Sequence, residues 1–122
     1  MRKPLFVLFL VLCLFTLRAQ RCVMLSVGDG LSSSSVNALY QDRRGDIWIA
    51  TENGLSRYDG LNIHTYKHDP ADPHSLSHNI VRSFAEDGQG RLLVGGEFGV
   101  QYYDPRTDAF SRPLRNESGE TY

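Results

Sequence analysis

Short apolar runs alternate with turn-forming residues along most of the chain, and this pattern predicts β-strands. Asp and Gly stand between the runs where tight turns need them, as Asp42 and Gly45 do in the first turn. The strands predicted in this way are Val36–Gln41, Asp46–Thr51, Leu55–Tyr58 and a run ending near Tyr66, followed by Val81–Glu86, Arg91–Gly96, Val100–Tyr103 and a last strand around Phe110.

The second group of strands repeats the first with a period of 45 residues. Seven of 24 aligned positions are identical, and the apolar positions between them match in type. The identical pairs are Val36 and Val81, Asp42 and Asp87, Gly45 and Gly90, Glu52 and Glu97, Gly54 and Gly99, Tyr58 and Tyr103, and Asp59 and Asp104. Four strands in a repeat of about 45 residues are typical of a β-propeller blade.

Both faces of the predicted sheets must be covered. Residues 47–50 and 92–94 are apolar without alternation, whereas a sheet with one wet face alternates apolar and polar side chains. Neighbouring blades supply that cover in a propeller. We therefore predict an all-β fold of about two four-stranded antiparallel blades of an incomplete β-propeller, preceded by a signal peptide. A small β-sandwich or meander without radial closure is the alternative.

The N-terminus has the order of a secretory signal. Arg2 and Lys3 come first, Leu5–Leu17 follow as thirteen residues without charge, and Ala19 stands where a signal peptidase would cut. The apolar run is shorter than the roughly 18 to 20 residues that cross a bilayer. An uncleaved anchor and a lipoprotein signal at Cys13 are the alternatives. Cleavage would take the net charge from −1 to −4 and leave Cys22 without an internal disulfide partner.

The period and the signal together predict the organisation of the 122 residues. The predicted parts are a signal peptide (1–19), a leading strand and link (20–35), a first blade (36–66), an inter-blade loop (67–79), a second blade (80–112), and the truncated start of a next link (113–122). The near-neutral charge argues against nucleic-acid binding by this chain, because proteins that bind the phosphate backbone have an excess of basic residues and this chain has none.

The blade residues resemble a specific family. Residues 29–32, 47–51 and 57–60, together with Gly45, Gly54 and the link 66–70, are similar to the two-component regulator propeller repeat. The second copy departs from that pattern where Leu93 replaces Trp48 and where glycines 95 and 96 replace Ala50 and Thr51. The residues of the expected structural blade motif are Asp42, Gly45, Trp48, Gly54, Tyr58, Asp59, Asp87, Gly90, Gly99, Tyr103 and Asp104.

The resemblance implies that the chain is the N-terminal fragment of a hybrid two-component system of Bacteroidetes. Such a parent has periplasmic propellers that sense oligosaccharides from polysaccharide breakdown, and it is a homodimer anchored in the inner membrane. Histidine kinase, phosphorelay and transcription control reside in its downstream domains. The resemblance therefore implies a periplasmic, non-enzymatic ligand-sensing fragment whose partners are an oligosaccharide and the remaining blades. The alternatives are an exported propeller adaptor without a kinase and a fragment of a propeller polysaccharide lyase.

Chemistry beyond the blades is sparse in the sequence. His64, His68, His74 and His78 lie close together, but the prolines between them prevent a continuous helix, so we expect loop polarity and no metal site. We expect no catalytic residue and no cofactor. The tyrosines serve either as sugar contacts or as packing between blades, and packing is the expected role; these residues are Tyr58, Tyr66, Tyr102 and Tyr103.

Overall fold

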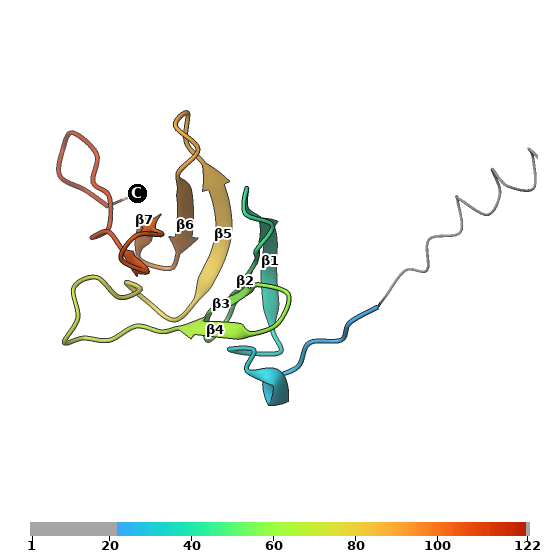
Figure 1. Ribbon diagram of the computed structural model, residues 1–122. Helices are drawn as coiled ribbons and strands as arrows, with labels where there is room; N and C mark the ends of the chain where they lie inside the picture. The colour runs from blue at the N-terminus through green and yellow to red at the C-terminus, as the bar shows by residue number, and fades with distance from the viewer. Residues whose placement is uncertain (1–21, 122) are drawn as a thin grey trace, which may run out of the picture.

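The computed structural model describes residues 22–121, which form two four-stranded antiparallel sheets (Figure 1). The first sheet holds β1 (Val36–Gln41), β2 (Ile47–Thr51), β3 (Gly54–Tyr58) and β4 (Ile63–Tyr66). The second holds β5 (Val81–Glu86), β6 (Leu92–Gly96), β7 (Gly99–Asp104) and β8 (Ala109–Phe110). Strands follow one another in sequence order across each sheet, so both sheets are meanders. The predicted all-β fold with two blade-like sheets is confirmed.

The same side-chain chemistry closes the first hairpin of both sheets. Asp42 accepts hydrogen bonds from the backbone N–H groups of Arg44 and Asp46, at 2.9 and 3.0 Å. Asp87 does the same for Gln89 and Arg91, at 2.9 and 2.8 Å. Gly45 and Gly90 take the left-handed conformation that these turns need, with φ of 89° and 76°. The identities at the 45-residue period therefore preserve the geometry of this hairpin turn in both sheets.

The link that enters each sheet also repeats, a feature that the sequence analysis missed. The backbone N–H of Ser32 donates to Ser56 Oγ at 2.9 Å, and that of Ser77 donates to Gln101 Oε1 at 2.8 Å. Ser56 and Gln101 occupy equivalent positions on β3 and β7, and both are buried. The signal for this link was the identity of Leu31 with Leu76 and of Ser32 with Ser77 at the same 45-residue shift.

The segment ahead of β1 differs from expectation. Residues 22–35 hold a single 3-10 turn, Val27–Asp29, and the leading strand predicted there is absent from this described stretch. Asp29 caps Ser26, accepting from its backbone N–H at 2.9 Å and its hydroxyl at 2.7 Å, and Gly30 follows in a left-handed conformation. The backbone N–H groups of Asp29, Gly30 and Leu31 donate to carbonyls within this turn, so they are not available for pairing with a strand. The predicted signal peptide lies outside the described residues.

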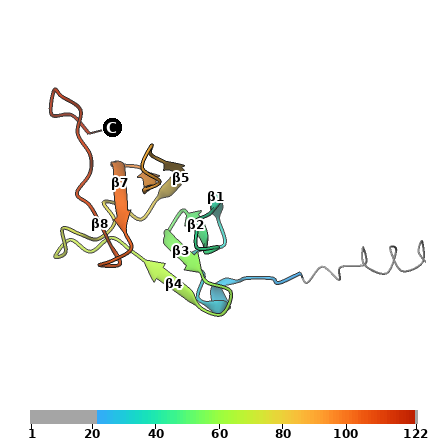
Figure 2. The same cartoon turned by 45° about the horizontal axis from the view of Figure 1, so that its top comes forward.

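The hydrophobic core lies between the two sheets, where β1 approaches β5 (Figures 1 and 2). Trp48 is fully buried there; its ring stacks on Tyr66 at 5.8 Å between centroids and meets Tyr103 edge-on at 4.6 Å. The other buried core residues are Ala50, Leu55, Leu76, Val81, Leu92, Val94 and Phe110. Each sheet thus covers one face of the other, whereas residues 47–50 and 92–94 predicted that both faces of each sheet are covered. No helix of residues 22–121 is long and apolar enough to cross a bilayer.

A polar network joins the sheets beside this core. The hydroxyls of Tyr66 and Tyr103 both donate to Asp108 Oδ1 at 2.6 Å, so one carboxylate holds a side chain from each sheet. Arg57 donates to Tyr66 at 3.1 Å and to Asp46 at 3.0 Å. Burial alone would raise the pKa of Asp108, but the two tyrosine hydrogen bonds and the charge of Arg57 outweigh it and lower this pKa.

The core position of β3 generates the first prediction. Leu55 is fully buried, and Leu39 on β1 is 66% exposed. Replacing Leu55→Ala should lower the free energy of unfolding by about 2–5 kcal/mol through lost burial and the cavity it leaves. The matched change Leu39→Ala should cost less than about 0.5 kcal/mol. Urea unfolding followed by Trp48 fluorescence measures both, and equal losses would contradict the packing described.

The network at Asp108 generates the second prediction. Its pKa is lowered in the folded state, so its carboxylate stabilises the fold above the unfolded pKa of about 3.9, and this contribution is lost as pH falls through the folded pKa. Asp108→Asn, which keeps the left-handed backbone favourable, should lower stability at pH 7 and flatten its decline below about pH 4. Urea unfolding between pH 7 and pH 3 provides the measurement.

Asp104→Asn is the control for this experiment, because Asp104 accepts from the backbone N–H of Arg106 within its own turn. It should cost less stability at pH 7 than Asp108→Asn, since both tyrosine hydroxyls keep their charged acceptor. If the two variants lost the same stability at pH 7, Asp108 would not be joining the sheets.

Candidate functional site

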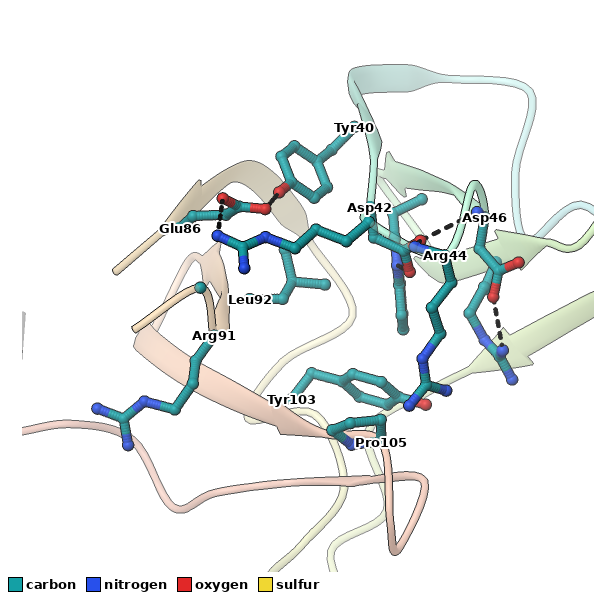
Figure 3. Close-up of a pocket in the computed structure, with 13 residues that line it drawn as sticks. Tyr40, Asp42, Arg44, Asp46, Glu86, Arg91, Leu92, Tyr103 and Pro105 are labelled. Carbon is teal, nitrogen blue, oxygen red and sulfur yellow. Dashed lines mark hydrogen bonds and ion pairs between the residues drawn. The ribbon is translucent and has the colours of Figure 1, made fainter. Parts of the chain in front are cut away.

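A cleft of about 260 Å³ opens between the two sheets, beside the first hairpin turn of each (Figure 3). The first sheet and its turn line it with Tyr40, Asp42, Arg43, Arg44, Asp46 and Arg57. The second sheet and its turns contribute Glu86, Gly90, Arg91, Leu92, Tyr103 and Pro105. Trp48 forms part of the wall at the boundary with the core. Sequence analysis placed no site here, because no single repeat contains the cleft.

Comparison of the two repeats separates the residues that build the turns from those that give the cleft its chemistry. Asp42 and Gly45 recur as Asp87 and Gly90 and hold the same hydrogen bonds. The residues that do not recur are Tyr40, Arg43, Arg44, Asp46 and Arg57, whose equivalents are Ala85, Gly88, Gln89, Arg91 and Tyr102. Turn formation therefore does not require the arginines of the first turn.

The acidic side chains of the cleft are already engaged. Asp42 accepts from two backbone N–H groups of its turn and, through Oδ2, from Trp48 Nε1 at 3.0 Å. Asp46 pairs with Arg57 at 3.0 Å, and both side chains are largely buried. Glu86 accepts from the hydroxyl of Tyr40, and this hydrogen bond raises the pKa of Tyr40 to about 12. These carboxylates thus hold the scaffold.

The arginines differ in how they are held. Burial alone would lower the pKa of Arg57, but hydrogen bonds to Tyr66 and Asp46 outweigh it and raise this pKa. Arg91 binds Asp87 at 2.6 Å and lies 4.2 Å from the ring centre of Tyr102. Arg43 is 75% exposed and reaches Glu86 at 4.0 Å. Within residues 22–121 the side chain of Arg44 has no ion pair, and it points toward Tyr103 and Pro105 (Figure 3).

The structure sorts the four tyrosines that the sequence offered as sugar contacts or packing. Tyr103 lines the cleft and also packs on Trp48, so it combines both roles. Tyr66 packs against the core. Tyr58 donates to the carbonyl of Gly60, and Tyr102 lies against Arg91 on the face away from the core. Of these tyrosines, Tyr103 is the one placed at the cleft.

The remaining blade-motif residues shape turns. Asp59 accepts from the backbone N–H groups of Asn62 and Leu61, and these bonds lower its pKa. Asp104 takes the same role for Arg106. Gly54 has φ of 113°, and a Cβ there would lie 2.7 Å from the carbonyl oxygen of Tyr66. Gly99 adopts the same conformation, with φ of 109°.

The four histidines have separate environments. His68 Nδ1 lies 2.6 Å from the carbonyl oxygen of Leu76, and His74 Nδ1 lies 3.3 Å from that of Phe110. His64 is 3.5 Å from Asp59, and His78 meets the ring of Phe98 edge-on. Among residues 22–121, His, Cys, Asp and Glu side chains form no group of three that could hold a metal ion.

The repeats match a described family. Residues 30–53 and 75–98 match the family described as Two component regulator propeller, and the starts of the two matches are one 45-residue period apart. A curated relative, histidine kinase P4 of Formosa agariphila, is 43% identical over 49 residues. That alignment covers 40% of this chain and 4% of the relative.

Two solved structures share the fold. Both are of the extracellular domain of BT4673 from B. thetaiotaomicron, which one description assigns to a one component system and the other to a hybrid two component system. Their TM-scores are 0.66 and 0.63, at 23% and 22% identity, with 85% and 84% of this chain covered. The chain spans 15% of each of them. Repeats, sheets and family match agree: the two stretches that match the two-component regulator propeller family, residues 30–53 and 75–98, each contain the first two strands of one sheet.

Proposed function

We propose that this chain is part of the periplasmic ligand-sensing propeller of a hybrid two-component regulator, and that its ligand is an oligosaccharide released by polysaccharide breakdown. The observation that carries the proposal is the pair of family repeats, whose packed sheets form one cleft between them. The proposal assigns binding, and no catalytic step, to residues 22–121. Phosphorelay and transcription control belong to other domains of the proposed parent.

The comparisons support an exported sensor. The curated relative is named a histidine kinase, and both structural neighbours are described as extracellular domains. In our proposal residues 1–19 direct export, and the parent is a homodimer anchored in the inner membrane.

Exposed apolar side chains support further blades as partners. Leu39 is equivalent to Phe84, whose ring packs on Tyr40 across the two sheets at 5.9 Å. Tyr58 is likewise equivalent to Tyr103, which packs on Trp48. In the second sheet, Phe84 and Tyr103 pack against the first sheet. Their equivalents Leu39 and Tyr58 give the outward face of the first sheet similar apolar and aromatic side chains. We propose that another blade of the same ring covers this face.

The cleft suits a sugar because it combines hydrogen-bonding groups with aromatic surface. Tyr40 and Tyr103 supply rings, and Arg43 and Arg44 supply donors. Binding sites for small ligands commonly combine apolar walls with a few placed polar groups. At about 260 Å³ the cleft lies just below the range of roughly 300–1,000 Å³ for pockets that enclose a drug-sized ligand, so it accommodates one part of a chain.

The third prediction tests oligosaccharide binding by this chain. Trp48 is the single tryptophan and lies at the cleft wall, so its indole N–H gives one NMR signal that reports on the cleft. A panel of neutral and acidic oligosaccharides of three to six sugar units should contain at least one that shifts this signal saturably. The corresponding monosaccharides, which lack neighbouring units, should bind more weakly. If no oligosaccharide in the panel bound, the proposed ligand class would be wrong.

A further inference from the structure

We propose that the cleft selects acidic saccharides, with the guanidinium group of Arg44 binding the carboxylate or sulfate of one sugar unit and Tyr103 and Pro105 forming the wall beside its ring. This inference deepens the proposed function and depends on it, because it names the class of oligosaccharide that the same cleft takes. It gives a role to a side chain that neither the turn nor the core uses.

The repeat comparison shows that this turn keeps both arginines without needing them. In the second sheet the equivalent turn has Gly88 and Gln89 at these positions and holds the same hydrogen bonds from its aspartate. The first turn therefore has two additional arginines at the mouth of the cleft, while Asp46, which pairs with Arg57, stands where the second turn has Arg91. Long cationic side chains cost conformational entropy when they are ordered, and binding an anion would offset that cost.

The acidic side chains beside the cleft leave Arg44 without an ion pair. Asp42 is engaged by its own turn and by Trp48, and Asp46 is paired with Arg57. Glu86 lies 4.0 Å from Arg43 and also accepts from Tyr40. Arg44 has no ion pair within the described residues. The lining as a whole, with four arginines and three carboxylates, is close to balanced, so the unpaired guanidinium of Arg44 is what the cleft offers to an anion.

The geometry favours a sugar acid over a free anion. Arg44 points toward Tyr103 and Pro105 (Figure 3), and all three residues line the cleft. A planar guanidinium binds a carboxylate or sulfate through two parallel hydrogen bonds, and an aromatic wall packs against the apolar face of a sugar ring. An acidic saccharide presents both features together.

The test compares matched acidic and neutral trisaccharides on the full chain. Triglucuronate and trigalacturonate are titrated against cellotriose and galactotriose, with sulfated galactotriose and inorganic sulfate as further arms. Calorimetry gives the dissociation constants, and the Trp48 indole signal locates binding at the cleft. Arg44→Gln is the test variant. Arg115→Gln, which removes an equal charge from an exposed position outside the cleft, is the control.

We expect at least one acidic trisaccharide to bind at least about tenfold more tightly than its neutral counterpart. We also expect Arg44→Gln to remove most of that difference and Arg115→Gln to leave it intact. Inorganic sulfate alone should bind more weakly than the acidic trisaccharide, because it cannot use the apolar wall.

The opposing outcomes separate this inference from the proposed function. Equal binding of neutral and acidic trisaccharides at the cleft would overturn acid selectivity and leave oligosaccharide sensing supported. Equal loss of affinity in the two arginine variants would show general charge attraction and overturn the assignment to Arg44. Inorganic sulfate binding as tightly as the sulfated trisaccharide would exclude recognition of the sugar. Failure of every saccharide to bind would overturn both proposals.

Discussion

Trp48 is the side chain on which most of the structure depends. It is fully buried between the sheets, stacks on Tyr66 of its own sheet and meets Tyr103 of the other. Its indole N–H donates to Asp42, which also holds the first hairpin turn. One residue thus joins the core, the interface between the sheets and the turn beside the cleft. The requirement behind this arrangement is that sheets apolar on both faces must be covered by a neighbour.

The cleft follows from the same arrangement. The turn around Asp42 is fixed by backbone hydrogen bonds, and that frees the side chains of Arg43 and Arg44 to face the cleft. On the opposite wall, Tyr103 is held by Trp48 and by Asp108. The aspartates and glycines of the turns recur in both repeats, whereas Arg43 and Arg44 do not. Binding chemistry can therefore change without disturbing the fold.

Much of the fold could be predicted from the sequence because strand runs and turns are local features. The predicted runs Val36–Gln41 and Val81–Glu86 coincide with β1 and β5. The interface between the two sheets could not be predicted in the same way. The 45-residue period shows which residues are equivalent in the two repeats, but it does not show which face of each sheet packs against the other. The sequence offered both Tyr66 and Tyr102 as sugar contacts or packing residues and could not separate them. In the structure Tyr66 packs against the core, and Tyr102 lies on the opposite face of its sheet.

Two further features show where local patterns fail. The segment before β1 forms a capped turn, because the hydrogen bonds from Ser26 to Asp29 compete with strand pairing. Asp108 joins the two sheets but is absent from the blade motif, since its role depends on the tyrosines that the fold brings to it. The cleft is missed for the same reason: its lining comes from both repeats.

A double-mutant cycle between Trp48 and Tyr103 tests most directly whether the two sheets pack as one unit. The free energies of unfolding of Trp48→Leu, Tyr103→Leu and the double variant are measured against the unchanged chain. An aromatic pair in contact across the interface should give a coupling energy of about 1 kcal/mol. Losses that add to within about 0.3 kcal/mol would show that the two rings do not interact, and would contradict the packed interface on which the cleft depends.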